Sequence, residues 1–163
     1  MRKKNALVLS SLLVALAASC VAQSANEQER NKAVARSFFE DVLGPGKLEG
    51  YAESHAPDFV AHGGGQDYTL AEDIAAAREE RTALPDMQIS VSHIVAEGEL
   101  VAVHWTASGT NTHAGMGLPA TGKKIKVSGM TIFRFKAGKI SEEWSAWDML
   151  SVLTQAGLFP PGK

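Results

Sequence analysis

Hydrophobic residues recur every three to four positions in the first half of the chain and every second position in most of the second half. This change of period separates a helical part from a sheet part. Val34, Phe38 and Val42 lie four residues apart and predict an amphipathic helix that begins near Asn26. The segment 44–46 reads Gly-Pro-Gly and predicts the end of this helix.

A second long helix is predicted after a connecting region. Thr69 and Glu72 match a capping box, in which each side chain bonds the backbone of the other residue. The helix therefore begins at Thr69 and ends before Pro85, which disfavours a helical residue in front of it. Residues 47–53 predict a short helical turn, and residues 54–68 predict an extended piece followed by a loop.

From Met87 to Asp148 the alternation of apolar and polar residues predicts four strands. Helices that precede an antiparallel meander indicate the α+β class, with the helices packed on one face of one sheet. The residues expected on that face are Met87, Ile89, Val91 and Val95; Val101, Val103, Trp105 and Ala107; Ile125, Val127, Thr131, Phe133 and Phe135; and Ile140, Trp144 and Ala146.

The dipeptide 137–138, Ala-Gly, predicts a two-residue turn between the last two strands. An uninterrupted hairpin would then pair Thr131 with Trp144 and Val127 with Asp148 on the apolar face. Gly129, in the middle of a strand, favours a curved sheet or a close approach of another group. We therefore expect a hollow under the helices, with Trp105, Thr131 and Trp144 among its lining residues.

Asp148 is a carboxylate at the end of the predicted apolar face. Two interpretations stay open. Burial beside Trp144 would raise its pKa and suit it to general acid or base catalysis. Alternatively, Asp148 precedes the apolar segment 149–153 and caps a final helix, which would favour its charged form.

The histidines offer weaker candidates. His93 falls on the predicted apolar face, His104 falls on the polar face, and His62 lies in the loop region where it could close the pocket or face solvent. Met130, Ile132 and Trp147 are apolar residues on the predicted polar face, which indicates a homodimer formed through the sheet.

The N-terminus predicts export. Residues 1–22 combine basic residues, an apolar run and small residues in the order of a secretory signal, so we expect a periplasmic or secreted protein. Cys20, the only cysteine, either accepts a lipid anchor or is removed with the signal by cleavage after Ala22. Residues 26–163 then form a single domain.

Composition excludes several other functions. The net charge is −2 without a strong basic cluster, which argues against nucleic acid as a partner. No His-Glu-x-x-His motif, cysteine pair, Gly-x-Ser-x-Gly turn or phosphate-binding loop occurs, so a site without metal or cofactor is expected.

Four stretches together carry a family resemblance: Gly-Thr-Asn-Thr-His-Ala-Gly-Met-Gly-Leu-Pro-Ala-Thr-Gly-Lys at 109–123, Ile-Phe-Arg-Phe-x-x-Gly-Lys-Ile at 132–140, Glu-Trp-x-x-Trp-Asp at 143–148, and Gln-Ala-Gly at 155–157. They resemble SnoaL-like polyketide or ester cyclases of the nuclear transport factor 2-like superfamily. The resemblance implies a cone-shaped, bent antiparallel sheet around N-terminal helices, and commonly a dimer.

The same resemblance implies site residues. It makes Asp148 the acid/base of a cofactor-free ring closure, adds His62, and places Asn111 in the pocket. The family usually has histidine where this chain has Asn111 and arginine where it has His104, so the substrate is expected to differ. Export likewise argues against polyketide ring closure itself.

These observations leave several functions open. The first is a cyclase, isomerase or lyase in which Asp148 moves a proton beside a carbonyl of an apolar ligand. The second is a non-catalytic module of the same fold that binds a ligand or dimerises. The third, addition or removal of water, would need a water-positioning pair such as Asn111 with Tyr51 or Tyr68.

Overall fold

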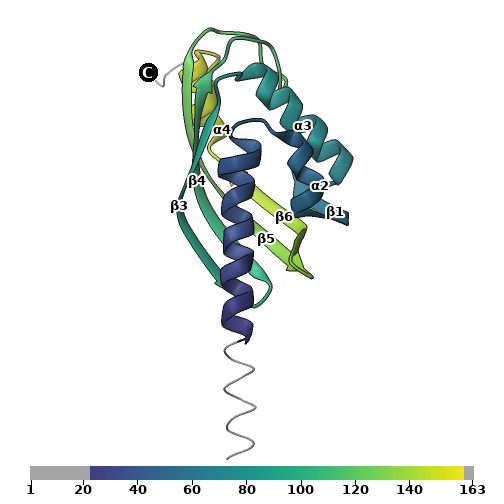
Figure 1. The fold of residues 1–163 in the computed structure, drawn as a ribbon. Coiled ribbons are helices and arrows are strands. Elements are labelled where there is room, and N and C mark those ends of the chain that lie inside the picture. Colours follow the sequence, from purple (N-terminus) through teal and green to yellow (C-terminus); the bar gives the residue numbers. More distant parts are fainter. Residues whose placement is uncertain (1–22, 160–163) are drawn as a thin grey trace, which may run out of the picture.

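Helices cover one side of a curved six-stranded sheet in the computed structural model, which describes residues 23–159 (Figure 1). This arrangement confirms the predicted α+β class and helical layer. The predicted signal segment 1–22, with Cys20, lies outside the described residues. None of the helices between residues 23 and 159 is long and apolar enough to cross a lipid bilayer.

Helical and extended elements follow one another from residue 23 to residue 156. The first helix spans residues 23–37 and continues as the wider π-helical turn η1 (Phe38–Leu43). The remaining elements are η2 (Leu48–Gly50), α2 (Tyr51–Ser54), β1 (His55–Gly63), β2 (Gln66–Thr69), α3 (Leu70–Ala83), β3 (Gln88–Glu97), β4 (Leu100–Thr110), β5 (Lys124–Lys136), β6 (Lys139–Trp147) and α4 (Met149–Ala156).

Local chemistry sets the helix ends as predicted. Gly44 ends the first helical segment, and its backbone N–H bonds the carbonyl of Phe39 at 2.9 Å. Thr69 and Glu72 form the capping box of α3: the Thr69 N–H donates to the Glu72 carboxylate at 2.8 Å, and the Glu72 N–H donates to the Thr69 hydroxyl at 3.4 Å.

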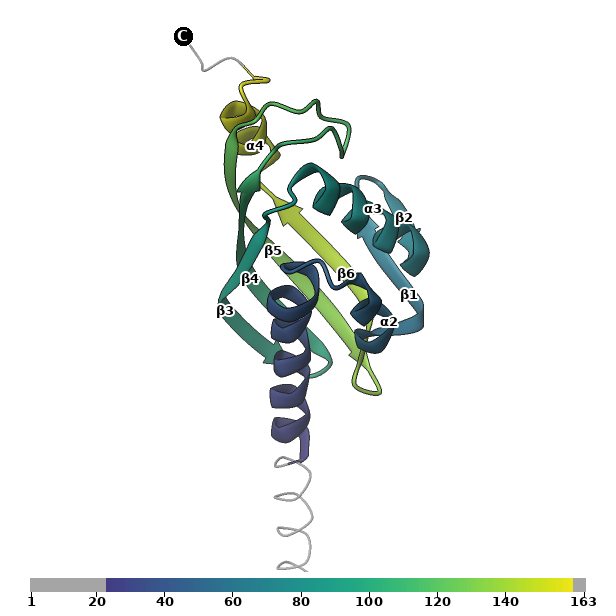
Figure 2. The ribbon, with the colours of Figure 1, turned by 45° about the horizontal axis from the view of Figure 1, so that its top comes forward.

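The strand order is β2-β1-β6-β5-β4-β3. All neighbours are antiparallel except β1 and β6, which run parallel. The segment predicted as an extended piece and a loop thus forms two strands, and β1 extends the predicted meander by pairing with its last strand, β6. Figure 2 shows α2 and α3 lying over this half of the sheet. The early segment therefore brings α3 over β6.

The core lies between the helices and the concave face. Its largest members are aromatic and come from η1, α2, β1, β4 and β5. Phe38 contacts Tyr51 edge to face at a centroid distance of 4.9 Å, and Phe39 stacks on Trp105 at 5.9 Å. These contacts fix η1 and α2 against the sheet.

Gly129 has the close neighbour that the sequence suggested. A Cβ at this position would lie 2.3 Å from Cζ2 of Trp105, whose indole covers the glycine from the facing position on β4. Only glycine leaves room for the ring there, since even a methyl group would overlap it. The pair sets how deeply Trp105 lies in the concave face.

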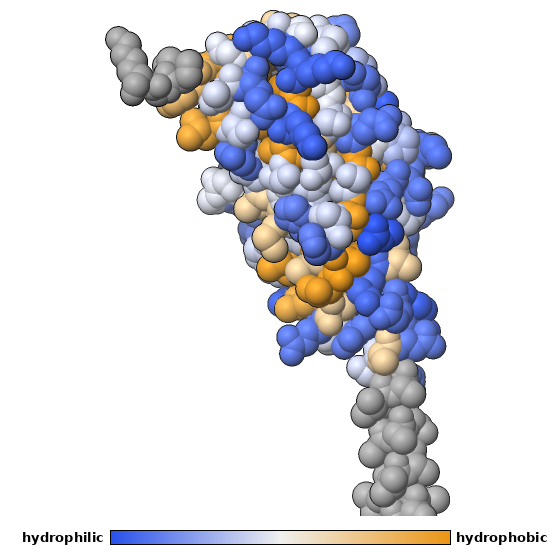
Figure 3. Space-filling model, turned by 90° about the vertical axis from the view of Figure 1, so that its left-hand side faces the viewer, coloured by the Kyte–Doolittle hydropathy of each residue, from blue (hydrophilic) through white to orange (hydrophobic). Residues whose placement is uncertain are grey.

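The convex face carries the exposed apolar residues from which a homodimer was predicted (Figure 3). Met130 and Ile132 are 55% and 41% exposed, and Val95 and Leu100 add to the apolar area. Trp147 is the exception. It pairs with Gly129, which faces the Trp105 indole, so Trp147 lies on the concave face. The homodimer itself stays a prediction.

Replacing Gly129 by alanine should destabilise the fold. The added methyl must displace the Trp105 indole, which also donates a hydrogen bond to Thr131. Overpacking of this kind costs about 1–3 kcal/mol. Urea unfolding followed by tryptophan fluorescence measures the loss; an unchanged midpoint for Gly129→Ala would show that the indole is not held where the structure places it.

Candidate functional site on the concave face

A bulge near the start of β6 decides which of its side chains face the helices. Phe135 pairs with Ile140 as the 137–138 turn predicts, but Arg134 pairs with Glu142, so one residue is inserted. Beyond this point the alternation is shifted by one. Phe133 therefore lies opposite Glu143 rather than Glu142, and Thr131 lies opposite Ser145 rather than Trp144. The predicted pairing of Thr131 with Trp144 is wrong for this reason.

Four side chains on the concave face form a chain of hydrogen bonds across three strands. The Trp105 indole N–H donates to the Thr131 hydroxyl at 3.0 Å, and the Thr131 and Ser145 hydroxyls lie 2.7 Å apart. The Ser145 hydroxyl donates to the carboxyl group of Glu143. Because Ser145 uses its proton on Glu143, Thr131 must donate to Ser145. Every donor thus points toward Glu143, and each bond polarises the next.

Two further carboxyl groups approach Glu143 from α3. Asp73 and Glu80 are seven residues apart, which is two helical turns and places them on the same side of the helix. The small residue Ala77 lies between them and is 5% exposed. The charges of Asp73 and Glu80 both act on Glu143, and the Tyr51 hydroxyl hydrogen-bonds Asp73.

Burial raises the pKa of all three acids. Desolvation and, next, the charge of Asp73 raise the pKa of Glu143 to about 7, whereas the Ser145 hydrogen bond acts against the shift. Desolvation, followed by the charge of Asp73, raises the pKa of Glu80 to about 7. Desolvation also raises the pKa of Asp73 to about 6, opposed by the Tyr51 hydrogen bond. The set therefore exchanges protons near neutral pH.

No arginine or lysine among residues 23–159 forms an ion pair with these three acids. Each acid is half-buried, so it retains some accessible surface although protein atoms surround most of it. Such a group can both lose hydration and reach a small molecule. The arrangement suits proton transfer to or from a small molecule that reaches the carboxyls.

The residues predicted to line one pocket do not lie together in the structure. Trp105 and Thr131 lie together in the interior and belong to the hydrogen-bond chain. Asn111 is 3% exposed, and its amide is used by its own loop: the oxygen accepts from Thr121, and the nitrogen donates to the carbonyl of His113. Asn111 therefore organises the loop that follows β4.

His62 and Trp144 come together on the convex face instead. The two rings stack at a centroid distance of 4.8 Å. The His62 ring nitrogens contact Asp67 at 2.7 Å and Glu142 at 3.3 Å. The hydrogen bond to Asp67, followed by the one to Glu142, raises the pKa of His62 despite some desolvation. This cluster fastens the β1–β2 hairpin to β6, on the side opposite Glu143.

His93 and Asp148 also lie away from the carboxyl set. A second bulge, after Val91 in β3, turns His93 to the exposed side and corrects its predicted inward orientation. Asp148 is exposed and is the N-cap of α4, where its carboxylate accepts the Ser151 N–H at 2.9 Å. The capping interpretation of Asp148 is thus confirmed, while its catalytic role stays a prediction.

Sequence reasoning missed Glu143, Ser145 and the acids of α3. The i, i+7 spacing of Asp73 and Glu80, on the same side as the apolar residues of that helix, was an available signal. The orientation of Glu143 and Ser145 was not available, because it depends on the bulge.

Comparison with known proteins places the chain in a family. Residues 33–156 match the family model of the SnoaL-like polyketide cyclases. The chain belongs to that family. No significant sequence match to a curated protein was found. The SnoaL-like match covers all strands and helix α3, and therefore the whole carboxyl set.

Solved SnoaL-like structures share the fold. AclR, a proposed hydroxylase from Streptomyces galilaeus, is 25% identical, with 82% of this chain and 89% of AclR covered at a TM-score of 0.75. IdmH, a proposed polyketide cyclase from Streptomyces antibioticus, is 27% identical, with 78% of this chain and 98% of IdmH covered at a TM-score of 0.69. An LEH-like epoxide hydrolase from M. tuberculosis shares the fold alone. It is 12% identical, with 80% of this chain and 91% of the hydrolase covered at a TM-score of 0.63.

The raised pKa values predict that stability falls as pH rises. Between about pH 4.5 and 7 the folded protein binds more protons at these acids than the unfolded chain, so the free energy of unfolding decreases with pH. Glu143→Gln removes one of these carboxyls and should stabilise the protein more at pH 8 than at pH 5, by on the order of 2 kcal/mol.

Urea unfolding of the wild type and Glu143→Gln at both pH values measures this difference. Asp148→Ala is the matched control, since loss of an N-cap costs about 0.5–2 kcal/mol and should do so similarly at both pH values. An equal effect of Glu143→Gln at pH 5 and pH 8 would show that Glu143 has an ordinary pKa.

Proposed function

We propose that this SnoaL-like protein is a small-molecule cyclase or isomerase in which Glu143 transfers a proton beside a carbonyl group of an apolar ligand. The observation that carries the proposal is the position of Glu143 at the end of the Trp105–Thr131–Ser145 hydrogen-bond chain. Its pKa of about 7 is near the optimum for a general base at neutral pH. The family supports reactions of the cyclase and isomerase kind.

The geometry supports a two-acid mechanism. The Glu143 carboxylate would accept a proton from the carbon next to the carbonyl, while a protonated Asp73 or Glu80 donates a hydrogen bond to the carbonyl oxygen. The enolate would then attack a second carbonyl and close a ring, or take the proton back at another carbon. In ring closure, the new alkoxide receives the proton of the α3 acid.

The hydrogen-bond chain would control the strength of Glu143 as a base. Ser145 keeps one carboxyl oxygen occupied, so the other oxygen is the one left to take the substrate proton. Phe39 stacks on Trp105, and both rings are buried beside the chain. An apolar ligand that covers the accessible part of the carboxyls would exclude water from them and strengthen each of these interactions.

The role of Asp148 as acid/base, implied by the family resemblance, is the competing proposal for the same reaction. A non-catalytic module that binds an apolar ligand is the alternative from another class. The unpaired carboxyls favour catalysis over binding alone, since a purely apolar binding site gains nothing from three acids that must lose their hydration.

The activity test needs no knowledge of the natural substrate. Small apolar ketones that raise the melting temperature of the protein are incubated with it in D2O, and exchange of their α-hydrogens is followed by NMR from pH 5 to 9. The wild-type rate should rise as Glu143 loses its proton near pH 7 and fall again at higher pH, as Asp73 and Glu80 lose the proton that the carbonyl oxygen needs. Glu143→Gln should lower it about 10²–10⁴-fold, the usual share of a general base.

Asp148→Asn distinguishes the candidates. If Glu143 is the base, Asp148→Asn keeps the exchange rate within about twofold and changes the melting temperature little, because the asparagine oxygen can still accept the Ser151 N–H as an N-cap. Loss of exchange in Asp148→Asn, with normal exchange in Glu143→Gln, would transfer the role to Asp148. Ketones that bind without any exchange would support the non-catalytic module.

A further inference from the structure

His55 lies at the junction of α2 and β1 and is only 1% exposed, although its ring carries two polar nitrogens. An aromatic cage formed by Phe38, Tyr51 and Phe59 surrounds the imidazole. Tyr51 stacks on it at a centroid distance of 5.0 Å, and Phe38 and Phe59 meet it edge to face, each at 4.7 Å. The proposed proton transfer does not involve this histidine, so its burial needs another explanation.

The hydrogen bonds of the imidazole fix its tautomer. Nδ1 of His55 lies 3.0 Å from the carbonyl oxygen of Tyr51 and 2.9 Å from the hydroxyl oxygen of Ser54. A carbonyl oxygen can only accept, so Nδ1 carries the hydrogen and donates to Tyr51. Ser54 can donate its own proton to the carbonyl of Gly50 at 3.2 Å or of Tyr51 at 3.1 Å. Nε2 of His55 then holds a lone pair, and it has no hydrogen-bond partner among residues 23–159.

The unpartnered Nε2 keeps the ring neutral, because a proton there would find no acceptor. Burial lowers the pKa of His55 to about 4; the hydrogen bond to Tyr51 acts against this shift, and the charge of Lys139 adds to it. The bond to Tyr51 therefore persists at the near-neutral pH at which the carboxyl set exchanges protons. A phenylalanine would fill the same cage without an unpartnered atom, so the contribution that needs histidine is the donation to Tyr51.

His55 thus holds Tyr51 at two points. Its Nδ1 bonds the main chain of Tyr51, and its ring stacks on the phenol. Phe38 contacts both rings, since it also meets Tyr51 edge to face at 4.9 Å. Tyr51 is 3% exposed as a result, and the hydroxyl at the far end of its ring hydrogen-bonds Asp73 of α3.

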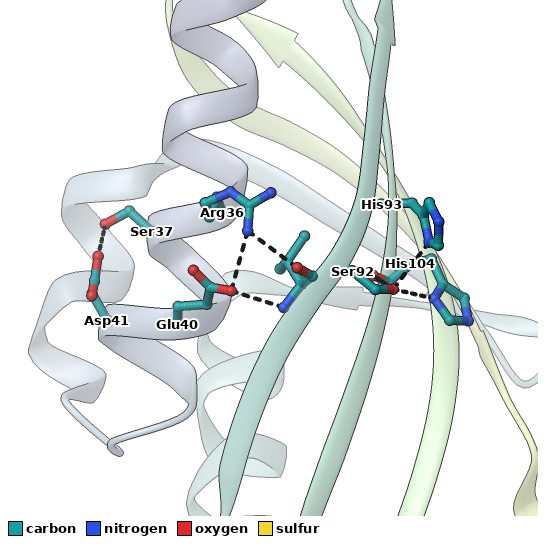
Figure 4. A network of polar contacts seen from close by, with 8 residues as sticks. Arg36, Ser37, Glu40, Asp41, Ser92, His93 and His104 are labelled. Carbon is teal, nitrogen blue, oxygen red and sulfur yellow. Dashed lines mark hydrogen bonds and ion pairs between the residues drawn. The ribbon is translucent and has the colours of Figure 1, made fainter.

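The segment that supplies Phe38 is itself fixed to the edge of the sheet (Figure 4). The backbone N–H of Val91 in β3 donates to the Glu40 carboxylate at 2.8 Å, and Arg36 donates to the Val91 carbonyl at 3.2 Å. Arg36 and Glu40 are also paired with each other at 3.2 Å. Phe38 lies midway between these two residues in the chain, so one wall of the aromatic cage is anchored to β3.

We propose that His55 is a positioning residue of the carboxyl set, because it holds the Tyr51 hydroxyl where it donates to the Asp73 carboxylate. A hydrogen bond to a carboxylate favours its charged form, so the position of Tyr51 affects the pH at which Asp73 releases its proton. The charge of Asp73 acts in turn on Glu80 and Glu143. The effect of His55 on catalysis rests on the proposed function, whereas its effect on Asp73 does not.

Carbon-13 NMR of the Asp73 carboxyl group, identified by its loss in Asp73→Asn, measures the effect directly. Tyr51→Phe removes the hydroxyl and should raise the titration midpoint of Asp73 by about half a pH unit or more. His55→Leu removes the Nδ1 donor and should give at least half of that shift. His55→Asn should return the midpoint most of the way to the wild-type value, because asparagine has the branched shape of leucine but carries an amide N–H in place of Nδ1.

Phe59→Leu is the matched control, since it removes another ring of the same cage that makes no hydrogen bond to Tyr51. It should lower the melting temperature and leave the Asp73 midpoint unchanged. Ketone exchange gives a second readout: the fall of the rate at high pH should move to higher pH in Tyr51→Phe and His55→Leu, but not in Phe59→Leu. If no ketone exchanges its hydrogens, the proposed function fails, and the NMR titration still decides the role of His55.

Three results would overturn the role of His55. The first is a wild-type Asp73 midpoint in Tyr51→Phe or His55→Leu. The second is an equal shift in His55→Asn and His55→Leu, which would make the hydrogen bond irrelevant. The third is a shift in Phe59→Leu as large as that in His55→Leu, which would assign the effect to packing. Should His55→Leu fail to fold, His55→Phe fills the cage without a donor and takes its place.

Discussion

One inserted residue at the start of β6 decides which side chains of that strand meet the helices. Without it, Trp144 would face α3 and Glu143 would face solvent. With it, Glu143 enters the space beneath Asp73 and Glu80, and Trp144 stacks on His62 outside. The bulge therefore determines that the concave face carries a hydrogen-bonded carboxyl group instead of another indole, and the candidate chemistry depends on that choice.

The desolvation of the three acids lowers the stability of the fold, and it also raises their pKa values so that they exchange protons near neutral pH. A carboxylate that loses its hydration without a cationic partner is unfavourable, and the group responds by keeping its proton. The Ser145 hydrogen bond compensates Glu143 only in part. Apolar side chains on this face would avoid the cost of desolvation, so the presence of Asp73, Glu80 and Glu143 together favours a use for their protons.

Features set by local chemistry could be predicted from the sequence. The capping box of α3 and the helix end at Gly44 each follow from a few adjacent residue types, and both are present. Gly129 indicated a close approach at its position, but the partner, Trp105, lies on another strand. The orientations beyond the two bulges could not be predicted, because an inserted residue leaves the apolar and polar composition of a strand unchanged while it reverses every later side chain. His93 and Trp144 were both assigned to the wrong face for this reason.

The two faces of the sheet share their strands but not their side chains. His104 and Trp105 are consecutive in β4, as Met130 and Thr131 are in β5, and in each pair one residue points outward and the other inward. A ligand on one face could therefore affect the other only by moving the strands themselves. The indole packed against Gly129 opposes such movement, because any shift of β4 relative to β5 would bring the ring into the backbone. Binding on the convex face is accordingly expected to leave the carboxyl set on the concave face unchanged.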